Sequence, residues 1–256
     1  MHNEQVFTPK WVVELMLNKI GYVPSNDIHH KHIIDNSCGD GAFLVEIVDR
    51  YIKHGILNRD ISKNELKKGL EKYIHGIEID GNLCAKTIGN LNKVASKYSI
   101  SNVKWDIVNA DAIDCKKFWY KMNFVIGNPP YCRIQDVTEE QREKYKSFCY
   151  FKEEDKKKQK GAFDSYMLFF NIGIRMLSKY DGKLCYITPS SWTTNLYGDN
   201  FREYLTDKKT LEYIIDMGHT KVFDNATTFT MITGIGNFYG NETTPIFRYN
   251  EEMKTF

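Results

Sequence analysis

The stretch "HIIDNSCGDGAFLVEIVDRYI", residues 32–52, decides the fold. A short apolar run ending in Asp35 is typical of a buried strand, and the apolar residues after position 41 recur at helical spacing. Gly39 and Gly41 lie between these two patterns. Glycines let the backbone come close to a ligand, and the N-terminus of the following helix favours an anionic group such as a carboxylate or phosphate. The stretch therefore predicts a strand, a ligand-binding glycine loop and a helix.

The rest of the chain repeats this alternation of strand and helix patterns. Apolar spacing predicts a first helix over 11–20, with Thr8 as its N-cap and Pro9 in its first turn. Further strands or helices are predicted within 73–98, 103–114, 123–131, 162–192, 200–207, 211–217, 229–238 and 245–250. Strand–helix alternation with short links predicts an α/β fold with a doubly wound, mostly parallel sheet of about seven strands. Ligands bind such sheets outside the carboxyl ends of the strands.

Composition limits the class of protein. The 256 residues, 42% of them hydrophobic, suffice for one well-packed α/β domain over 1–256. A net charge of +2 is not the strong basic signature of a nucleic-acid coat protein, although a DNA enzyme can gather its basic residues on one face. No apolar run approaches the roughly 20 residues that cross a membrane, and the N-terminus has no signal-peptide core.

The cysteine and histidine patterns do not predict a metal site. Six scattered cysteines form no C-x-x-C pair, which argues against a zinc ribbon or a disulfide scaffold. Reduced thiols of this kind are typical of a cytoplasm, and we expect a bacterial one. The run "HHKH", residues 29–32, is interpreted as an exposed turn that binds metal at most adventitiously.

Acidic residues follow the next two predicted strands. Glu78, in "GIEID", lies about where a Rossmann enzyme places the acid that binds ribose hydroxyls, or else it is a surface acid near a helix start. Asp111, in "NADAID", can accept a hydrogen bond from an adenine amino group, or else it forms an ordinary Asx turn. Ribose, adenine and a carboxylate-bearing tail together describe S-adenosylmethionine, and describe a dinucleotide less well.

The corner "NPPY", residues 128–131, ends the strand "FVIG" because a proline has no backbone N–H for the sheet. Asn128 offers a side-chain oxygen and Pro129 a carbonyl oxygen, two acceptors for the hydrogen atoms of one amino group. The Tyr131 ring offers a face on which a base can stack. Direct transfer to such an amine requires alignment more than a strong base. No cysteine nucleophile follows a proline here, so a covalent route to cytosine C5 is not supported.

A charged segment, residues 132–160, follows this corner. Runs of charge usually lie in solvent, so one interpretation is a surface insertion. The other is a mobile loop that closes over the substrate entrance, since the segment comes directly after "NPPY". The sequence leaves both interpretations open.

From residue 5 to about residue 238 the chain resembles the gamma group of DNA amino-methyltransferases from bacterial restriction–modification systems, the TaqI-like and type IIG-like N6-adenine enzymes. The resemblance rests on the order of "FTPKWVVELM", "DNSCGDGAFL", "GIEID", "NADAID", "IGNPPY", "YITPSSWTTNLYGDNFREYL" and "ATTFTMI". It implies a Rossmann-like class I fold, S-adenosyl-L-methionine as cofactor, and methylation of a flipped-out adenine in double-stranded DNA.

The resemblance also implies roles for individual residues. Cofactor contacts are expected from Phe7, Thr8, Pro9, Asp35, Cys38, Gly39, Gly41, Glu78, Ile79, Asp111, Ala112 and Asn128. The catalytic motif is Asn128, Pro129, Pro130 and Tyr131. The target base is expected to stack on Tyr131 and on a second aromatic ring, for which Phe229 is a candidate and Phe238 another.

The chain departs from the family pattern at its C-terminal end. Family members usually carry a further DNA-recognition domain, and this sequence stops about twenty residues after the last motif. We expect that domain to be truncated or supplied by a partner, because base pairs are read by side chains at the groove edges. Contacts to phosphate alone would bind DNA weakly.

Four other functions remain as alternatives. Protein-glutamine N5-methyltransferases also carry "NPPY", but the early "FTPKWVVELM" element argues against them. RNA N-methylation and cytosine N4 as acceptor use the same chemistry. A non-catalytic subunit that binds cofactor for a partner is disfavoured, because the glycine loop and "NPPY" are both intact.

Overall fold

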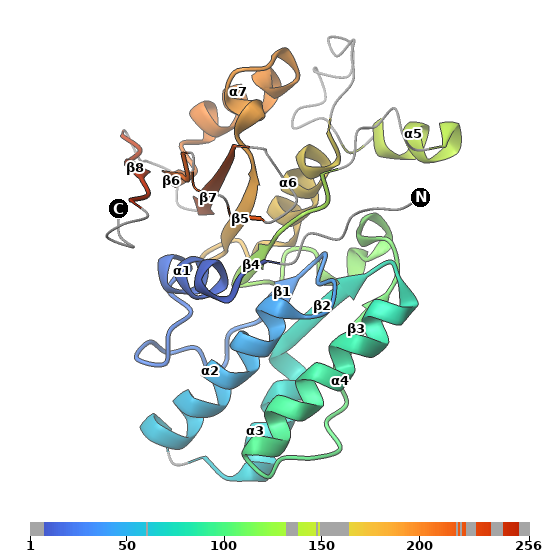
Figure 1. The fold of residues 1–256 in the computed structure, drawn as a ribbon, viewed down its shortest axis with the longest axis vertical. Coiled ribbons are helices and arrows are strands. Elements are labelled where there is room, and N and C mark those ends of the chain that lie inside the picture. Colours follow the sequence, from blue (N-terminus) through green and yellow to red (C-terminus); the bar gives the residue numbers. More distant parts are fainter. Residues whose placement is uncertain are drawn as a thin grey trace.

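The computed structural model describes residues 8–59, 61–131, 138–146, 148, 164–218, 220, 222–223, 229–236 and 243–250 (Figure 1). One sheet of eight strands has the order β3-β2-β1-β4-β5-β7-β6-β8. Its strands are β1 (Ile33–Asp35), β2 (Ile74–Glu78), β3 (Asp106–Asn109), β4 (Phe124–Gly127), β5 (Lys183–Pro189), β6 (Leu211–Asp216), β7 (Thr230–Gly236) and β8 (Ile246–Arg248). The α-helices are α1 (Lys10–Ile20), α2 (Ala42–Arg59), α3 (Lys63–Tyr73), α4 (Gly81–Lys97), α5 (Glu139–Lys146), α6 (Ser165–Met176) and α7 (Asp199–Lys208).

The predicted fold class is confirmed, with eight strands where about seven were expected. The pairs β3–β2, β2–β1, β1–β4 and β4–β5 are parallel, and β7 runs antiparallel between β5 and β6. Strands β1, β2 and β3 are added in sequence toward one edge of the sheet. The chain then returns to the middle and adds β4 on the other side of β1, so the strand order reverses there. This switch point is where a doubly wound sheet binds its ligands.

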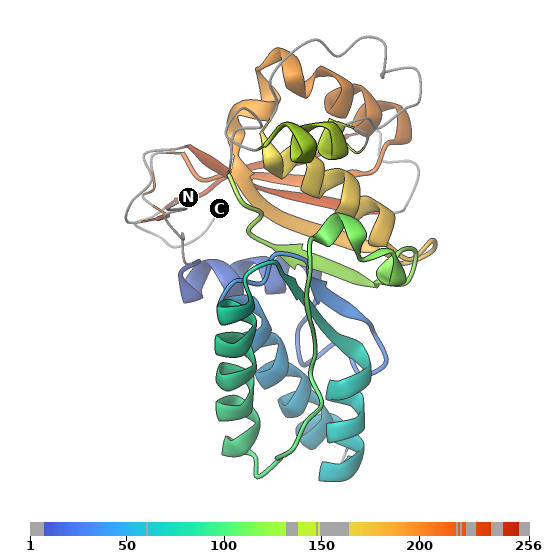
Figure 2. The same cartoon turned by 90° about the vertical axis from the view of Figure 1, so that its right-hand side faces the viewer.

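Helices lie on both faces of the sheet (Figure 2), and an apolar cluster fills the space between the sheet and the helices on each face. Helices α1 to α4 contribute to one cluster, and α6 and α7 to the other. Successive side chains of a strand point to opposite faces, so Ile33 joins the first cluster and Ile34 the second. Strand β4 alternates in the same way, with Val125 in the second cluster and Ile126 in the first. Burial on both faces explains why these strands are continuously apolar.

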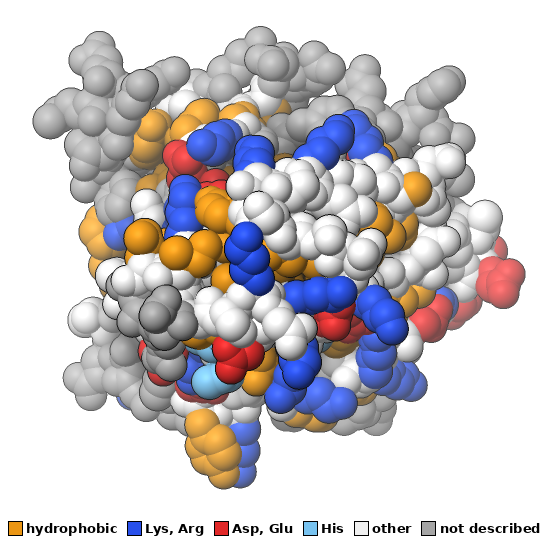
Figure 3. Space-filling model, turned by 90° about the horizontal axis from the view of Figure 1, so that it is seen from below, with side chains coloured by type: hydrophobic (Ala, Val, Ile, Leu, Met, Phe, Trp, Pro, Cys, Tyr) orange, Lys and Arg blue, Asp and Glu red, His pale blue; other side chains and the backbone are white. Residues whose placement is uncertain are grey.

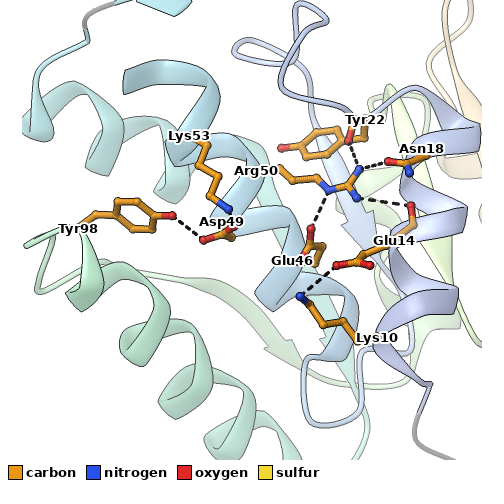
Figure 4. A network of polar contacts seen from close by, with 9 residues as sticks. All are labelled: Lys10, Glu14, Asn18, Tyr22, Glu46, Asp49, Arg50, Lys53 and Tyr98. Atoms are coloured by element: carbon orange, nitrogen blue, oxygen red, sulfur yellow. Dashed lines mark hydrogen bonds and ion pairs between the residues drawn. The ribbon is translucent and has the colours of Figure 1, made fainter. Parts of the chain in front are cut away.

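Helix α1 is fastened to α2 by a buried arginine (Figure 4). Arg50 of α2, only 7% exposed, donates from Nη1 to Asn18 Oδ1 at 2.8 Å and to the Tyr22 carbonyl at 3.0 Å. Its Nε lies 2.9 Å from Glu46 Oε1. A buried guanidinium needs such partners for both its charge and its N–H groups. The contacts fix the start of the chain relative to the helix that follows the glycine loop.

Two local predictions are wrong, and one helix was not predicted. Pro9, not Thr8, is the N-cap of α1, and no side chain caps the helix. Helix α3 was missed; its sequence signal is the capping box in which Ser62 and Glu65 exchange hydrogen bonds. The "HHKH" run is no exposed turn throughout, because His29 is 7% exposed and stacks on Tyr51 with ring centroids 4.9 Å apart.

The surface is mixed in charge. Seen from below, lysine and arginine side chains are spread over the face with acidic and apolar side chains between them (Figure 3). This agrees with the nearly balanced composition of 35 basic and 33 acidic residues. Within the described part of the chain, no helix has the length and apolar character needed to span a membrane.

A close approach between β1 and β4 gives the first test. A Cβ at Gly127 would lie 2.7 Å from Asp35 Oδ1, closer than atoms can pack. We expect Gly127→Ala to lower the free energy of unfolding by about 1–3 kcal/mol, because the strands must shift to admit the methyl group. Urea denaturation measures this. Gly89→Ala is the matched control, since its Cβ would meet nothing within 4 Å and alanine favours the helix. Equal losses in both variants would contradict the close approach.

Candidate functional site

The glycine loop between β1 and α2 is held in a left-handed conformation. Gly39 and Gly41 have φ of 54° and 90°, values that other residues adopt only with strain. Gly39 N donates to Glu78 Oε2 at 2.8 Å, and Thr87 Oγ1 donates to the Gly39 carbonyl at 2.8 Å. Cys38 is buried, and its N–H bonds the Ile77 carbonyl at 2.9 Å. The loop is therefore preformed, with its shape set by β2 and α4.

Glu78 supports two turns at once at the end of β2. Besides the bond from Gly39, its Oε1 accepts from Asp80 N at 3.0 Å. A carboxylate offers about four acceptor positions, so Glu78 keeps capacity for the hydroxyl groups of a ligand. The adjacent Ile79 side chain is 63% exposed. An exposed apolar residue beside a carboxylate fits a ribose with an attached planar base.

Asp111 follows β3 and caps the short 3-10 helix η1 (Ala112–Asp114). Its Oδ1 accepts from Ile113 N at 3.1 Å, and its Oδ2 lies 3.2 Å from Lys144 Nζ of α5. Lys144 also pairs with Asp114 Oδ2 at 2.8 Å. Ala112 is buried at 4% exposure. The part of the charged segment that the structure describes as α5 is thus tied to the turn expected to face the cofactor adenine, while most of 132–160 lies outside the described residues.

Asp35 ends β1 as a buried carboxyl group. It is 1% exposed, and its Oδ1 accepts from Ser37 N at 3.1 Å. Burial raises its pKa to about 8, and the charge of Glu78 adds to the shift. A buried carboxylate is costly unless a positive group pairs with it, so this position suits a cationic ligand.

The corner after β4 is built around the Asn128 amide. Asn128 Nδ2 donates to Thr8 Oγ1 at 3.2 Å, and Tyr131 Oη donates to Asn128 Oδ1 at 2.5 Å. Ser37 Oγ lies 3.4 Å from the Asn128 carbonyl, which joins the corner to the glycine loop. Pro129 is buried, and the Pro130 carbonyl accepts from Ser165 Oγ of α6. The corner is thereby anchored to Thr8, to the glycine loop and to α6.

The Tyr131 ring lies between two other aromatic rings. Tyr166 and Phe223 both stand edge-on to it, each with a ring centroid 6.3 Å away. Phe223, 2% exposed, was not among the residues predicted from the sequence; its signal is weak, a single aromatic in the link after β6. Phe7 and Phe238 lie outside the described residues.

Phe229 is 54% exposed and lies on the wall of an open cavity of about 840 Å³. The cavity is formed where β5, β6 and β8 end and β7 begins. Its polar lining includes Ser190, Thr193, Asp216 and Arg248. Aromatic, hydroxyl and charged groups in one open cavity can contact the bases and the backbone of a nucleic acid.

A hydroxyl network flanks the corner on the α6 side. Tyr166 Oη lies 2.8 Å from Ser191 Oγ and 2.9 Å from Tyr197 Oη, and Tyr197 Oη donates to Asp164 Oδ2 at 3.0 Å. Sequence reasoning did not identify this network. It fixes the residues that pack against Tyr131.

Comparison with known proteins identifies a family model and several relatives. Residues 40–223 match the model of the Eco57I restriction-modification methylase family. The Type II methyltransferase M.BstVI of Geobacillus stearothermophilus is 30% identical over 239 residues, which are 87% of this chain and 40% of that protein. RM.Eco57I of Escherichia coli, a Type II restriction enzyme and methyltransferase, is 27% identical over 80% of this chain and 24% of its own length. The chain thus spans less than half of either relative.

Solved structures share the fold. The DrdV–DNA complex superposes with a TM-score of 0.71 at 15% identity, covering 94% of this chain and 27% of that one. A putative class I S-adenosylmethionine-dependent methyltransferase from Listeria monocytogenes has a TM-score of 0.65 at 16% identity, covering 97% of this chain and 67% of its own.

The buried carboxyl group makes a pH prediction. The pKa of Asp35 is about 8 in the folded chain and about 3.9 when unfolded. Between these values the folded chain keeps a proton that the unfolded chain has lost, so the free energy of unfolding falls as pH rises from about 4 to about 8. Asp35→Asn removes this contribution. Urea denaturation across that pH range should show a flatter profile for the variant than for the wild type, and parallel profiles would contradict the raised pKa.

Proposed function

Because the chain belongs to the Eco57I restriction-modification methylase family, we propose that it transfers a methyl group to the N6 amino group of an adenine in double-stranded DNA. The fold and the family indicate S-adenosyl-L-methionine as the cofactor. The observation that carries the proposal is the Asn128 amide, held at the carboxyl end of β4 directly beside the glycine loop. We propose that this methyl transfer is part of a restriction–modification system in the bacterial cytoplasm.

The strand ends fit the cofactor. Glu78 has acceptor capacity for ribose hydroxyls, exposed Ile79 offers an apolar surface for the adenine ring, and Asp111 offers an acceptor for its amino group. Asp35 suits the positive charge of the cofactor. We assign further cofactor contacts to Phe7, Thr8, Pro9, Cys38, Gly39, Gly41 and Ala112. When bound, the cofactor supplies a methyl group activated by its sulfonium.

The corner fits the acceptor. An exocyclic amine is a weak nucleophile because its lone pair is delocalised into the ring. Asn128 Oδ1 and the Pro129 carbonyl accept hydrogen bonds from its two N–H groups, which favours a pyramidal nitrogen with its lone pair available. The amine is held in line for transfer, and alignment supplies most of the rate enhancement. Pro130 keeps the corner rigid.

The base leaves the DNA stack to reach this corner, at a cost of a few kcal/mol. Stacking on Tyr131 offsets part of that cost. Phe223 packs edge-on against Tyr131 and is 2% exposed, so it holds that ring in place. Phe229 is 54% exposed on the wall of the open cavity and stays the candidate for the second stacking ring. We propose that the recognition sequence is read by a further region of the full-length protein or by a partner, since the relatives are more than twice as long as the aligned part.

Asn128→Ala tests the catalytic assignment. Full-length protein is incubated with S-adenosyl-L-methionine labelled in the methyl group and with DNA free of methyladenine, and the DNA is digested to nucleosides. The wild type should place label in N6-methyladenine. The variant should lose transfer by at least 100-fold, because it lacks an acceptor for the amine. The change in cofactor Kd in a calorimetric titration should be far smaller, because the other cofactor contacts remain.

The control is Asn26→Ala, which removes an exposed amide bonded to Gly21 in the loop after α1. It should transfer like the wild type. Label in N4-methylcytosine would show that the methylated base is cytosine and not adenine. Full activity of Asn128→Ala would reject the mechanism.

Leucine substitutions separate the two candidate rings. Phe229→Leu keeps an exposed apolar side chain but removes the aromatic face, so we expect kcat/KM for DNA to fall about tenfold. Phe223→Leu keeps an apolar side chain packed against Tyr131 and should have a smaller effect, and cofactor affinity should be unchanged in both. Steady-state kinetics with varied DNA measures this. A larger loss in Phe223→Leu would reverse the assignment.

A further inference from the structure

The hydroxyl group of Thr8 does not cap helix α1, which begins two residues later. Threonine before a helix commonly caps it, yet α1 begins with Pro9 as N-cap and without a side-chain cap. The Thr8 Oγ1 instead accepts from Asn128 Nδ2 at 3.2 Å, across 120 positions of sequence. A hydrogen bond between residues so far apart in the sequence, one of them in the proposed catalytic motif, indicates a role for Thr8 in the reaction.

We propose that Thr8 is a positioning residue for the Asn128 amide, in addition to any contact with the cofactor. The proposal rests on the proposed function of Asn128. Thr8 holds the nitrogen end of the amide, while Tyr131 holds the oxygen end through its hydroxyl group. The tyrosine thus acts through its hydroxyl as well as through its ring.

The chemistry of an amide explains why both ends need a partner. The terminal torsion of asparagine is soft and roughly two-fold, so an unrestrained amide turns freely and exchanges its oxygen for its NH2 group. An NH2 group facing the substrate amine would offer donors where acceptors are required. Oδ1 has two lone pairs, and Tyr131 uses one of them, which leaves the other for the amine. Holding the amide plane therefore presents that lone pair to the substrate.

The position of Thr8 is itself rigid. The Pro9 ring restricts the backbone next to it, and the Pro9 carbonyl accepts from Val12 N and Val13 N in the first turn of α1. Helix α1 is fastened to α2 by Arg50, and α2 begins at the glycine loop (Figure 4). Thr8 therefore connects the corner at Asn128 to the two helices that adjoin the glycine loop. The residues that bind the methyl acceptor and those that bind the cofactor then keep a fixed relative position.

The test compares Thr8→Val with Thr8→Ser. Valine keeps the shape and removes the acceptor, whereas serine keeps the hydroxyl group. In the full-length protein at saturating cofactor, where the loss of its cofactor contact does not limit the rate, we expect Thr8→Val to lower kcat about three- to tenfold, the effect of one neutral hydrogen bond. Thr8→Ser should restore kcat. A rise in cofactor Kd with unchanged kcat would make Thr8 a cofactor contact alone and overturn the proposal.

Tyr131→Phe extends the test to the other end of the amide. It removes the hydroxyl group and keeps the ring. Because both hydroxyl groups act on the same amide, the losses in Thr8→Val and Tyr131→Phe should not be additive in the double variant. Additive losses would show that the two hydroxyl groups do not act on the same Asn128 amide.

A readout without turnover separates this proposal from the proposed function. The side-chain NH2 resonances of Asn128 are assigned in the 15N spectrum by their loss in Asn128→Ala. They should shift in Thr8→Val and return toward the wild-type position in Thr8→Ser. If the wild type methylates no DNA but the resonances shift, the proposed function fails and the contact stands. If the wild type methylates DNA and Thr8→Val changes neither kcat nor the resonances, the positioning role alone fails.

Discussion

The parallel pairing of β1 with β4 is the constraint on which the site depends. Ile33 pairs with Phe124 and Ile34 with Val125, so the two strands end at the same edge of the sheet. The glycine loop leaves one strand and the acceptor corner leaves its neighbour, and Ser37 Oγ reaches the Asn128 carbonyl at 3.4 Å. The absence of a side chain at Gly127 permits this approach, because a Cβ there would collide with Asp35. A transfer reaction needs its two partners adjacent, and this pairing supplies the adjacency.

Around that edge, the glycine loop and the corner are also held by residues to which no ligand contact is assigned. Thr87 and Asn90 bond the carbonyl groups of Gly39 and Asp40. Ser165 bonds the Pro130 carbonyl. Fixed dipoles and backbone groups of this kind need little reorganisation during a reaction, which is how a preorganised site lowers a barrier. The α5 helix adds a charged contact, because Lys144 joins the turn of Asp111 to the segment that follows the corner.

The sequence predicted what depends on local pattern. Alternating strands and helices, the two glycines and the two prolines suffice for the fold class, which the structure confirms. The resemblance to bacterial restriction–modification methyltransferases is confirmed by the match to the family model. The spacing of motifs in the sequence does not reveal contacts between distant residues. The hydrogen bond from Asn128 to Thr8 and the packing of Phe223 on Tyr131 depend on how the helices and strands pack together. Helix α3 was missed for a different reason: Leu66 and Leu70 stand at helical spacing, but most of its eleven residues are charged and only Leu66, Gly69 and Leu70 are buried.

A crystal structure with S-adenosyl-L-homocysteine tests the central claim most directly, because it locates the reacting atom relative to the corner. The account predicts ribose hydroxyl groups bonded to Glu78, adenine against Ile79, and the sulfur directed toward Asn128. A ligand that binds with its ribose away from Glu78, or with its sulfur directed away from Asn128, would contradict it.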